Sequence, residues 1–546
     1  MDLPATPEPS TDLIRRLAEL NEIGIALSQE KNLDRLLEAI LVAAKRITHA
    51  DGGTLYRRHG ATPDELHFEI IRTDSLGIAM GGTTGVKISY APVRLRDPAG
   101  RENTSMVVAY SVLKDRTIAV ADAYQEKGFD FSGTKAFDRQ TGYRSTSFLT
   151  VPMKNHEDEI IGVLQLINAK DRVTGAIVPF TETDMRLAES LASQAAMALT
   201  NRLLLLQLET LFESFIGIIN QAIDEKSPYT AGHCHRVPIL TMLLAEAAHA
   251  TQSGPLAAWH MNDKDRYELK IAGLLHDCGK VTTPVHIVDK ATKLQTIYDR
   301  IEVVDTRFEV LKRDAEIELH RQLLDPAANP AKLQLAYRAR LRELDEDRRF
   351  LRTCNIGSEA MKPGEAERVQ LIARKYRWKN PQGDEVDFLT KDEVLNLTVH
   401  AGTLTGAERQ VINHHINVTI KMLESLPWPR HLQRVPEYAG GHHERVDGKG
   451  YPRGLTREQM SVQARIMGIA DIFEALTARD RPYKEGKSLS ESLQILGQMR
   501  LNGHIDPDLF DIFVRERVYL RYASQFMDPR QVDAVDVAKI PGYAGD

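Results

Sequence analysis

One long helical pattern divides this chain into two parts of different character. Residues 181–224 contain no proline. Within them, apolar residues recur at spacings of 4, 3, 4 and 3 positions: Leu204, Leu208, Leu211, Phe215 and Ile218. This spacing is typical of the seam of a coiled coil. The pattern therefore predicts a helix that joins two domains and could pair two chains, although an amphipathic helix packed on its own domain would show it too.

The part before this helix is predicted to combine helices with a sheet. A helical opening covers residues 13–47, and short stretches of alternating apolar and polar residues follow, as in 66–70. Such alternation is typical of half-buried strands. Residues 147–153 and 160–168 flank a polar turn. We expect these two runs to form an antiparallel hairpin within a sheet core.

The hairpin sequence FLTVPMKNHEDEIIGVLQLINAKD resembles a GAF domain, the small sensory fold of phosphodiesterases and signalling kinases. The resemblance extends over about residues 12–200. It implies an α+β sensor domain, an antiparallel sheet with helices, which binds an unknown small ligand or serves only as a dimerisation scaffold.

In GAF domains that bind cyclic nucleotides, an Asn-Lys pair is followed by Phe, three residues and Asp-Glu. The sequence here approaches this pattern, but Ala169 separates the pair and Met185 replaces the Glu. The resemblance gives three candidate ligand contacts: Asn168, Lys170 and Asp184. In the alternative interpretation, the first two end a strand and the third lies in the first turn of a helix, where an acidic residue is favourable.

The part after residue 221 has long helical periods and no convincing strand pattern, which predicts an all-α domain. Residues 289–400 differ from the rest because they are highly charged. Apolar residues at 301, 304, 308, 311 and 315 keep a 3, 4, 3, 4 spacing, and a second helical stretch covers 332–351. We expect a helical hairpin inserted into the domain. It is either a partner or dimer surface or a solvated decoration without a partner.

The strongest local signal is the heptapeptide LLHDCGK at residues 274–280. An apolar helical face precedes His276 and Asp277, so both are expected near the end of a buried helix. A buried carboxylate without a partner costs several kcal/mol, and a metal ion removes that cost. The chain has 18 His but 3 Cys, so metal ligands would be imidazoles and carboxylates, which suit Fe, Mn or Zn. An isolated His-Asp pair would more often be structural.

Further histidines and aspartates change that judgement. The chain contains His-Asp-x-Gly-Lys at 276–280 and His-His-Glu-x-x-Asp-Gly-x-Gly-Tyr-Pro at 442–452. It therefore resembles the HD-GYP family, the bacterial cyclic di-GMP phosphodiesterases within the HD phosphohydrolase superfamily, over about residues 220–525. The resemblance implies an all-α HD-GYP domain with a helical insertion, and two divalent metals, Fe or Mn.

Carried over by position, the resemblance implies one shared set of metal ligands: His233, His276, Asp277, His415, His442, His443 and Asp471. Asp277 would bridge both ions. His414 competes with His415, but counting from Leu404-Thr405 favours His415. Some members hold a third metal through a Glu at the position of Tyr229, so two metals are expected here.

The chemistry of such a pair of cations suits phosphodiester cleavage, because it binds the phosphate oxygens and lowers the pKa of a bound water. Lys280 is expected to meet negative charge on the phosphate, and with Asp277 it is a candidate catalytic residue; a solvated lysine is the alternative. The resemblance adds three candidate substrate-binding residues: Tyr451, Arg481 and Lys484.

Composition limits the partners. Lys and Arg total 70 against 76 Asp and Glu, a formal charge of −6, which gives no general basic field for a nucleic acid polymer. The N-terminus has acidic residues and no apolar signal region, and no uninterrupted apolar run is long enough for a membrane span. We expect a cytoplasmic protein, a homodimer, with possible signalling protein partners.

The sequence thus predicts a disordered N-terminus (1–11), a GAF sensor (12–180), a signalling helix (181–224), an HD-GYP domain (225–525) with its insertion (289–400), and a C-terminal tail (526–546). The predicted function is hydrolysis of cyclic di-GMP, which either stops at pGpG or continues to GMP. Two alternatives remain: a catalytically weak cyclic di-GMP receptor that acts through protein contacts, or a phosphohydrolase of another nucleotide such as cyclic GMP-AMP.

Overall fold

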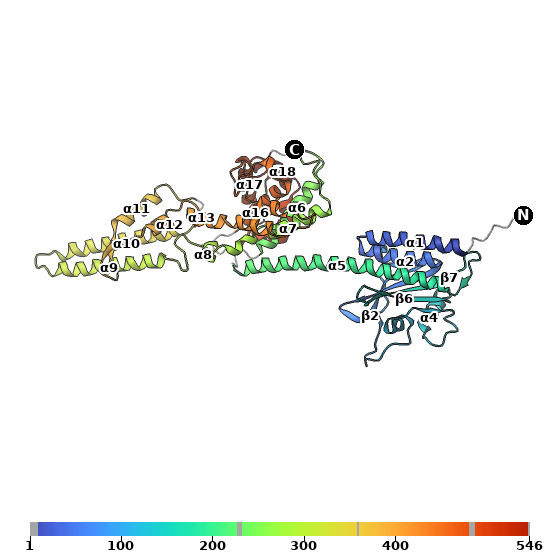
Figure 1. The fold of residues 1–546 in the computed structure, drawn as a ribbon. Helices are drawn as coiled ribbons and strands as arrows, with labels where there is room; N and C mark the ends of the chain where they lie inside the picture. Colours follow the sequence, from blue (N-terminus) through green and yellow to red (C-terminus); the bar gives the residue numbers. More distant parts are fainter. Residues whose placement is uncertain (1–8, 227–231, 358–359, 480–485, 544–546) are drawn as a thin grey trace. The chain divides into compact units, whose positions relative to one another are not determined.

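The computed structural model describes residues 9–226, 232–357, 360–479 and 486–543. The chain forms two compact units, one up to Phe212 and one from Glu213 onward (Figure 1). The first unit contains the large sheet, and the second is mainly helical. This arrangement agrees with the predicted sequence of an α+β domain followed by a helical one.

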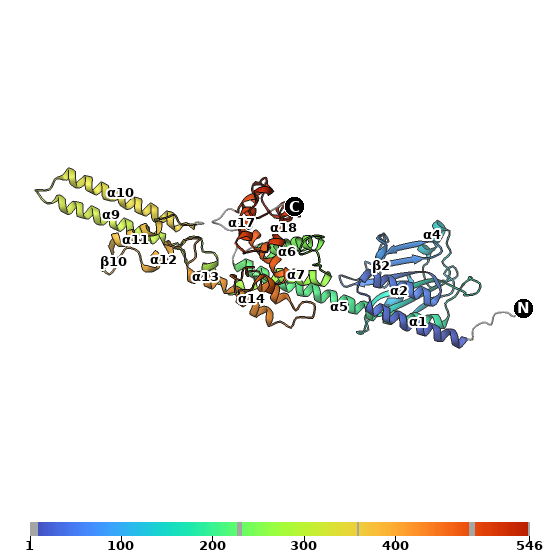
Figure 2. The same cartoon turned by 90° about the horizontal axis from the view of Figure 1, so that it is seen from above.

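The first unit is built on an antiparallel sheet (Figure 2). Its strand order is β3-β2-β1-β7-β6-β5, with β4 paired to β2 and β8 paired to β7. The strands are β1 (Ala50–His59), β2 (Thr62–Thr73), β3 (Ile78–Gly81), β4 (Val93–Arg94), β5 (Ile118–Val120), β6 (Phe148–Lys154), β7 (Ile160–Lys170) and β8 (Ile177–Val178). The predicted hairpin is β6 with β7, whose residues pair from Phe148 opposite Ile167 onward. Alternate residues of β6, Leu149, Val151 and Met153, enter one core cluster, as the two-residue period of a strand requires.

Helices cover both faces of this sheet. On one face, α1 (Pro9–Gln29), α2 (Leu33–Thr48) and the first half of α5 (Glu182–Lys226) share a core with the sheet. On the other, α3 (Val107–Lys114) packs over Tyr56 and Val163, and α4 (Ser132–Thr141) follows β5. The predicted helical opening is two helices, because Asn32 accepts a hydrogen bond from the Arg35 backbone N–H at 2.9 Å and starts a new helix.

The first helix begins earlier than expected. α1 starts at Pro9, so the prediction of disorder up to residue 11 is wrong for the last residues of that segment. Proline is well tolerated in the first turn of a helix, because its missing N–H would have no partner there.

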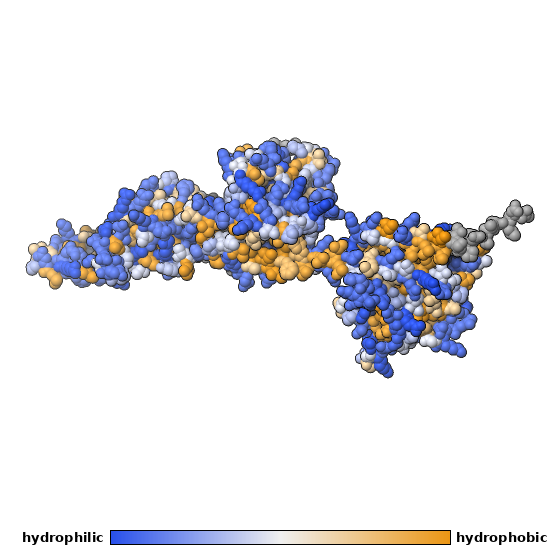
Figure 3. Space-filling model, viewed as in Figure 1, coloured by the Kyte–Doolittle hydropathy of each residue, from blue (hydrophilic) through white to orange (hydrophobic). Residues whose placement is uncertain are grey.

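The connecting helix α5 is continuous over 45 residues. All five residues of the predicted seam are exposed, from 45% for Leu204 to 60% for Leu208, and apolar side chains gather along this stretch (Figure 3). By length and composition alone, α5 could cross a membrane. This differs from the expectation from sequence, because Glu209 and Glu213 interrupt the apolar run.

The second unit has a helical core around α6 (His233–Ala250), α7 (Asp263–Leu275) and α16 (Val462–Thr477). Around them lie the helices α8 (Val285–Val288), α13 (Gly406–Asn413), α14 (His415–Glu424), α15 (Val435–Gly440), α17 (Leu489–Leu501), α18 (Pro507–Arg515) and α19 (Val518–Phe526). α6 and α7 approach closely at Gly273, where an added Cβ would lie 3.2 Å from the Cα of Pro238. The glycine therefore permits the contact between the two helices.

The insertion is a folded subdomain and not only a hairpin. α9 (Ile301–Leu323) and α10 (Pro330–Asn355) form the predicted helical hairpin, and α11 (Glu365–Lys375) and α12 (Lys391–Leu397) pack beside it. Phe308, Tyr376 and Phe388 form an aromatic cluster in its core. A two-stranded sheet, β9 (Arg377–Lys379) with β10 (Glu385–Asp387), was not expected, because three-residue strands show no periodicity.

The C-terminal tail packs on the helical unit. The Gln531 side chain donates to the backbone carbonyls of Thr477 and Lys487, each at 3.0 Å, and Ile540 is buried. The tail is thus part of the domain's structure.

A buried carboxylate gives the first unit a predictable response to acid. Asp51 on β1 is paired with Lys170 and accepts a hydrogen bond from Tyr143 at 2.6 Å. Burial raises the pKa of Asp51, but hydrogen bonds from Lys170, Ser75 and Tyr143 outweigh it and hold that pKa below the ordinary 3.8. A lowered pKa stabilises the folded state above pH 3.8, and this contribution is lost as the pH falls through the folded-state value.

We therefore expect Asp51→Asn to lower the free energy of unfolding of the first unit by about 1–3 kcal/mol at pH 7. In this variant the free energy of unfolding should also fall less below about pH 4 than in the native chain. Scanning calorimetry of the full chain between pH 7 and pH 3 measures both effects. Asp158→Asn is the control, because that side chain is 91% exposed at a turn. Equal acid sensitivity in Asp51→Asn and the native chain would contradict the assignment.

Candidate metal centre

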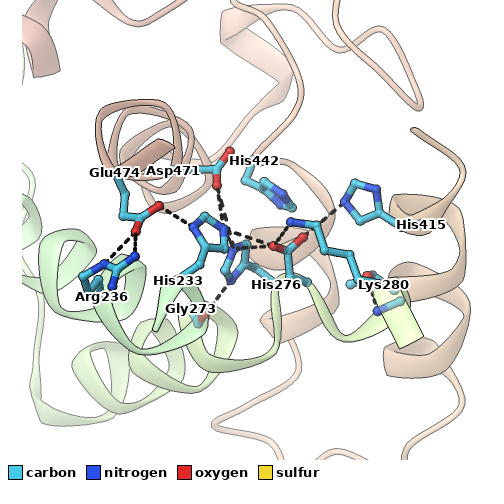
Figure 4. A network of polar contacts seen from close by, with 12 residues as sticks. His233, Arg236, Gly273, His276, Lys280, His415, His442, Asp471 and Glu474 are labelled. Carbon is cyan, nitrogen blue, oxygen red and sulfur yellow. Dashed lines mark hydrogen bonds and ion pairs between the residues drawn. The ribbon is translucent and has the colours of Figure 1, made fainter. Parts of the chain in front are cut away.

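Helix termini and the middle of one helix bring the predicted ligands together in the second unit (Figure 4). His233 is the first residue of α6, His276 directly follows α7, and His415 is the first residue of α14. His442 follows α15, and Asp471 lies within α16. Except for Asp471 and His443, which are partly exposed, these side chains are buried. The sequence motifs are thus far apart along the chain but converge on one point.

A glycine in the His-Asp-x-Gly-Lys motif makes this convergence possible. Gly279 lies in the 3-10 helix η2 (Cys278–Thr282), and an added Cβ would be 2.1 Å from the carbonyl oxygen of His415. The Gly279 N–H also donates to the Thr419 hydroxyl at 2.9 Å. Any side chain at position 279 would push α14 away, and His415 with it.

Asp277 lies between two groups of ligands. On one side its Oδ2 is 3.1 Å from Nε2 of His233 and 3.3 Å from Nε2 of His276. Nε2 of His233 is also 3.2 Å from Oδ1 of Asp471. We call His233, His276, Asp277 and Asp471 the first half-site.

The other oxygen of Asp277 faces a second group. Its Oδ1 is 3.2 Å from Nε2 of His415, and these two residues lie with His442 and His443 so that one ligand atom of each is within 4.8 Å of the others. We call this group the second half-site. The two oxygens of Asp277 are therefore shared between the half-sites, as the bridging role requires.

The histidine rings are held in the tautomer that can bind a metal. Nδ1 of His276, His415 and His442 lies 2.8, 2.5 and 2.6 Å from the backbone carbonyls of residues 273, 412 and 439. A carbonyl can only accept, so each Nδ1 carries the proton and each Nε2 keeps its lone pair.

This tautomer leaves acceptors facing one another. Nε2 of His415, Nε2 of His442 and Oδ1 of Asp277 are buried and have no hydrogen-bond partner among the described residues. Buried polar atoms without partners are costly, and a carboxylate oxygen 3.2 Å from an imidazole lone pair is favourable only with a cation between them. The residues of this cluster therefore fit divalent metal ions.

The protonation states of Asp277 and of the paired histidines 442 and 443 agree with this role. Burial lowers the pKa of His443 to about 4 and that of His442 well below its usual value. Burial opposes ionisation of Asp277, but the ammonium of Lys280 beside it holds its pKa well below its usual range. Neutral imidazoles and ionised carboxylates are the forms that ligate metals.

The predicted substrate-side residues flank the cluster. Lys280 forms an ion pair with Asp277, and its side chain is 23% exposed. The ring of Tyr451 stacks on that of His443 at 4.8 Å and 25°. Glu444 holds the loop of Tyr451, since its carboxylate accepts the backbone N–H groups of Arg453 and Leu455 at 2.7 and 2.9 Å. Both candidate groups therefore border the half-sites.

Several predicted residues lie elsewhere. Arg481, Lys484 and Tyr229 fall outside the described residues. His414 is exposed between α13 and α14, whereas its neighbour His415 enters the second half-site.

The three candidate ligand contacts of the first unit take part in separate structural contacts. The buried Asn168 amide holds the backbone of residues 144, 146 and 147. Lys170 pairs with Asp51, and Asp184 pairs with Arg16 at 2.6 Å in the first turn of α5. These contacts favour the structural interpretation of the motif.

Sequence reasoning missed one group that touches a ligand. The Glu474 carboxylate lies 2.5 Å from Nδ1 of His233 and also binds Arg236. Glu474 follows Asp471 by three positions, so both lie on one face of α16. That spacing was the available signal, but charged neighbours at this spacing are common on helices.

Comparisons with known proteins describe the same two parts. A family model of the GAF domain matches residues 32–199, and two HD domain models match residues 230–349 and 390–509. A GAF domain structure from an Acinetobacter phosphoenolpyruvate-protein phosphotransferase covers 34% of this chain and 94% of its own, with 14% identity and a TM-score of 0.24.

Curated relatives match over shorter stretches. A cyclic di-GMP phosphodiesterase of Pseudomonas aeruginosa is 37% identical over 124 residues, 23% of this chain and 28% of the relative. A 3'3'-cGAMP-specific phosphodiesterase of Vibrio cholerae is 47% identical over 81 residues, 15% of this chain and 19% of the relative. A cyclic di-GMP phosphodiesterase of Thermotoga maritima is 35% identical over 115 residues, 21% and 30%. The chain thus spans less than a third of each of these relatives.

Removal of the shared ligand tests the cluster as a metal centre. We expect the double variant His276→Ala, Asp277→Ala to lose bound metal from both half-sites, because Asp277 contributes an oxygen to each. Elemental analysis of purified protein measures the metal content per chain. His414→Ala is the matched control and should keep its metal, because His414 is exposed. Equal metal loss in both variants would contradict the assignment of His415 over His414.

Proposed function

We propose that this chain, which contains a GAF domain followed by an HD domain, is a metal-dependent phosphodiesterase that hydrolyses cyclic di-GMP to pGpG and on to GMP. The proposal rests on the position of Asp277, whose two carboxylate oxygens face separate groups of histidines. The cyclic di-GMP phosphodiesterases among the relatives support the substrate. We further propose that the protein is cytoplasmic and that a small ligand of the GAF domain regulates it.

The proposed centre holds two divalent cations, Fe or Mn, in the two half-sites. Ligands of nitrogen and oxygen without sulfur suit these metals. Bound there, the cations would act as Lewis acids toward a phosphodiester and lower the pKa of a bound water. The remaining roles fall to side chains of this chain.

Lys280 is placed to compensate charge on the substrate. Nearby carboxylates oppose the effect of burial and raise the pKa of Lys280, so it stays protonated. In the structure its ammonium binds Asp277. We propose that it turns to the phosphate once cations neutralise that carboxylate, because a compact ammonium interacts strongly with phosphate oxygens.

The loop of Tyr451 is proposed to bind the base. Its ring stacks on His443, and the loop can approach only because position 450 is glycine: an added Cβ would lie 2.3 Å from the backbone nitrogen of Arg445. Arg481 and Lys484 remain proposed phosphate contacts. An aromatic ring and basic side chains are what a cyclic dinucleotide requires.

One relative supports 3'3'-cGAMP as a second candidate substrate. The stretch of 47% identity belongs to a phosphodiesterase specific for 3'3'-cGAMP. That molecule has the same phosphodiester linkages and differs in one base, so the metal centre would treat both alike. Discrimination would fall to the residues that touch the bases. A receptor without turnover is the remaining alternative.

Turnover decides among these possibilities. Protein loaded anaerobically with Fe or Mn is incubated with cyclic di-GMP and, separately, with 3'3'-cGAMP, and linear products are separated by chromatography. We expect pGpG from cyclic di-GMP at a higher kcat/KM than for 3'3'-cGAMP. Binding without product under either metal would contradict the enzyme and favour the receptor.

Lys280→Ala should lower kcat by about 10²–10³-fold, the effect typical of removing one group that stabilises transition-state charge, while metal content stays unchanged. Lys421→Ala, on the neighbouring helix α14, is the control and should keep full turnover. Unchanged kcat in Lys280→Ala would remove Lys280 from the proposed mechanism.

We also propose that α5 pairs with α5 of a second copy in a parallel coiled coil. In the heptad set by the seam, Asn201 occupies an a position, where asparagine favours two strands in register. The flanking positions nearest the seam carry no charge, while Glu209 and Glu213 lie on the outer face. Two identical chains would therefore meet without repulsion between like charges.

The outer face of the same helix is already occupied. Ile216 and Ile223 are buried in the second unit, and Glu213 pairs with Lys270 at 3.0 Å. A helix with one face packed on its own domain and glutamates on that face is poorly suited to cross a bilayer. A second copy is therefore the favoured occupant of the seam.

Cysteine crosslinking tests this pairing in the full chain. Leu204→Cys and Ile218→Cys stand 14 positions apart, about 21 Å along a helix. In a parallel pair each variant should form a disulfide-linked dimer with itself, because identical seam residues face each other. The native cysteines are buried.

Glu209→Cys, on the outer face, is the control and should not crosslink. Crosslinks only in a mixture of the two seam variants would indicate an antiparallel pair. A monomer that floats with anionic vesicles would instead favour a membrane as the occupant.

A further inference from the structure

The two half-sites differ in what supports their histidines. Nδ1 of His276, His415 and His442 donates to a neutral backbone carbonyl of the same local turn. Nδ1 of His233 instead lies 2.5 Å from Oε2 of Glu474. Among the ligands in the described part of the chain, His233 alone has a carboxylate behind its ring.

Glu474 is held firmly in that position. Its side chain is 1% exposed, and its other oxygen, Oε1, accepts from Nε of Arg236 at 2.7 Å. Figure 4 shows this chain of contacts from Arg236 through Glu474 to His233. Arg236 follows His233 by three positions on α6, and Glu474 follows Asp471 by three on α16. One turn of each helix therefore supplies both a ligand and its support.

Burial makes this arrangement specific. A carboxylate taken out of water is costly unless it is paired and hydrogen-bonded. The two oxygens of Glu474 meet this requirement, because Oε2 lies against Nδ1 of His233 and Oε1 accepts from Arg236. Glu474 thus has one oxygen for each partner.

A carboxylate behind a ligating imidazole orients the ring and raises the basicity of its other nitrogen. A carbonyl orients the ring with less effect on basicity, since it is neutral. The first half-site also contains two carboxylates, Asp277 and Asp471, whereas the second contains Asp277 and three histidines. Both differences should give the first half-site a higher affinity for a divalent cation than the second.

We propose that Glu474 is a positioning residue that makes the first half-site the tighter of the two, so that it fills before the second. This inference rests on the proposed dinuclear centre. Glu474 acts through His233 and does not itself belong to the ligand set.

Metal titration of the full chain tests the order of filling. Protein freed of metal is titrated with Mn²⁺, and calorimetry gives the affinities while electron paramagnetic resonance separates isolated ions from coupled pairs. We expect isolated Mn²⁺ up to one equivalent and a coupled pair thereafter. Pairs from the first addition, or two equal affinities, would overturn the proposed order.

Glu474→Gln keeps the shape and an acceptor for His233 but removes the charge. It should weaken the first binding step by about 10–100-fold, the range typical for outer-shell partners of metal ligands, and change the second much less. Glu474→Asp should restore part of the affinity because it restores the carboxylate. Glu268→Gln is the matched control, since Glu268 is also buried but bonds the backbone N–H of Arg434.

The outcomes separate this inference from the proposed function. An unchanged first step in Glu474→Gln, or equal weakening of both steps, would overturn the role of Glu474 while leaving the metal centre intact. A native chain that binds no Mn²⁺ would overturn both. If Glu474→Gln fails to fold by circular dichroism, Arg236→Gln replaces it and should weaken the same step by a smaller factor, because Glu474 loses its second anchor.

Discussion

The structure of the second unit depends on one buried carboxylate. Asp277 is 2% exposed in its side chain, and its negative charge has to be balanced where water is absent. Imidazoles from separate helices and Lys280 surround it, yet no donor in the described part of the chain hydrogen-bonds to its Oδ1. The glycines at 273 and 279 serve the same end, because they let α6, α7 and α14 approach closely enough to place these groups. A cation is the component that completes this arrangement.

The helix α5 connects this centre with the rest of the chain. Its last residue, Lys226, donates to the backbone carbonyl of Lys280 at 3.3 Å and to that of Val281. These carbonyls belong to η2, which also carries Gly279 against α14. The connecting helix therefore ends on the short segment that orients Lys280. Its outer face packs on the second unit through Ile216 and Ile223, and its seam from Leu204 to Ile218 is exposed.

The sequence predicted the features that depend on fixed spacing. The hairpin of β6 and β7 follows from two-residue alternation. The residues of the half-sites come from sequence motifs, and the structure brings their side chains together. Packing partners could not be predicted in this way. The aromatic core of the insertion unites residues 308, 376 and 388, which no local period connects, and Glu474 is a charged helical residue until the fold places it behind His233. Asn168 and Lys170 belong to a motif that resembles ligand contacts. In the structure, however, Asn168 hydrogen-bonds to the protein's own backbone and Lys170 pairs with Asp51.

The central claim is that the cluster around Asp277 is a dinuclear metal centre. Anomalous diffraction at the manganese absorption edge, from crystals of the metal-loaded chain, tests it most directly. The account predicts two anomalous peaks, one bounded by His233, His276 and Asp471 and one by His415, His442 and His443, with Asp277 in contact with both and Lys280 released from it. A single peak, or an intact Lys280–Asp277 ion pair with no peak beside it, would contradict the account.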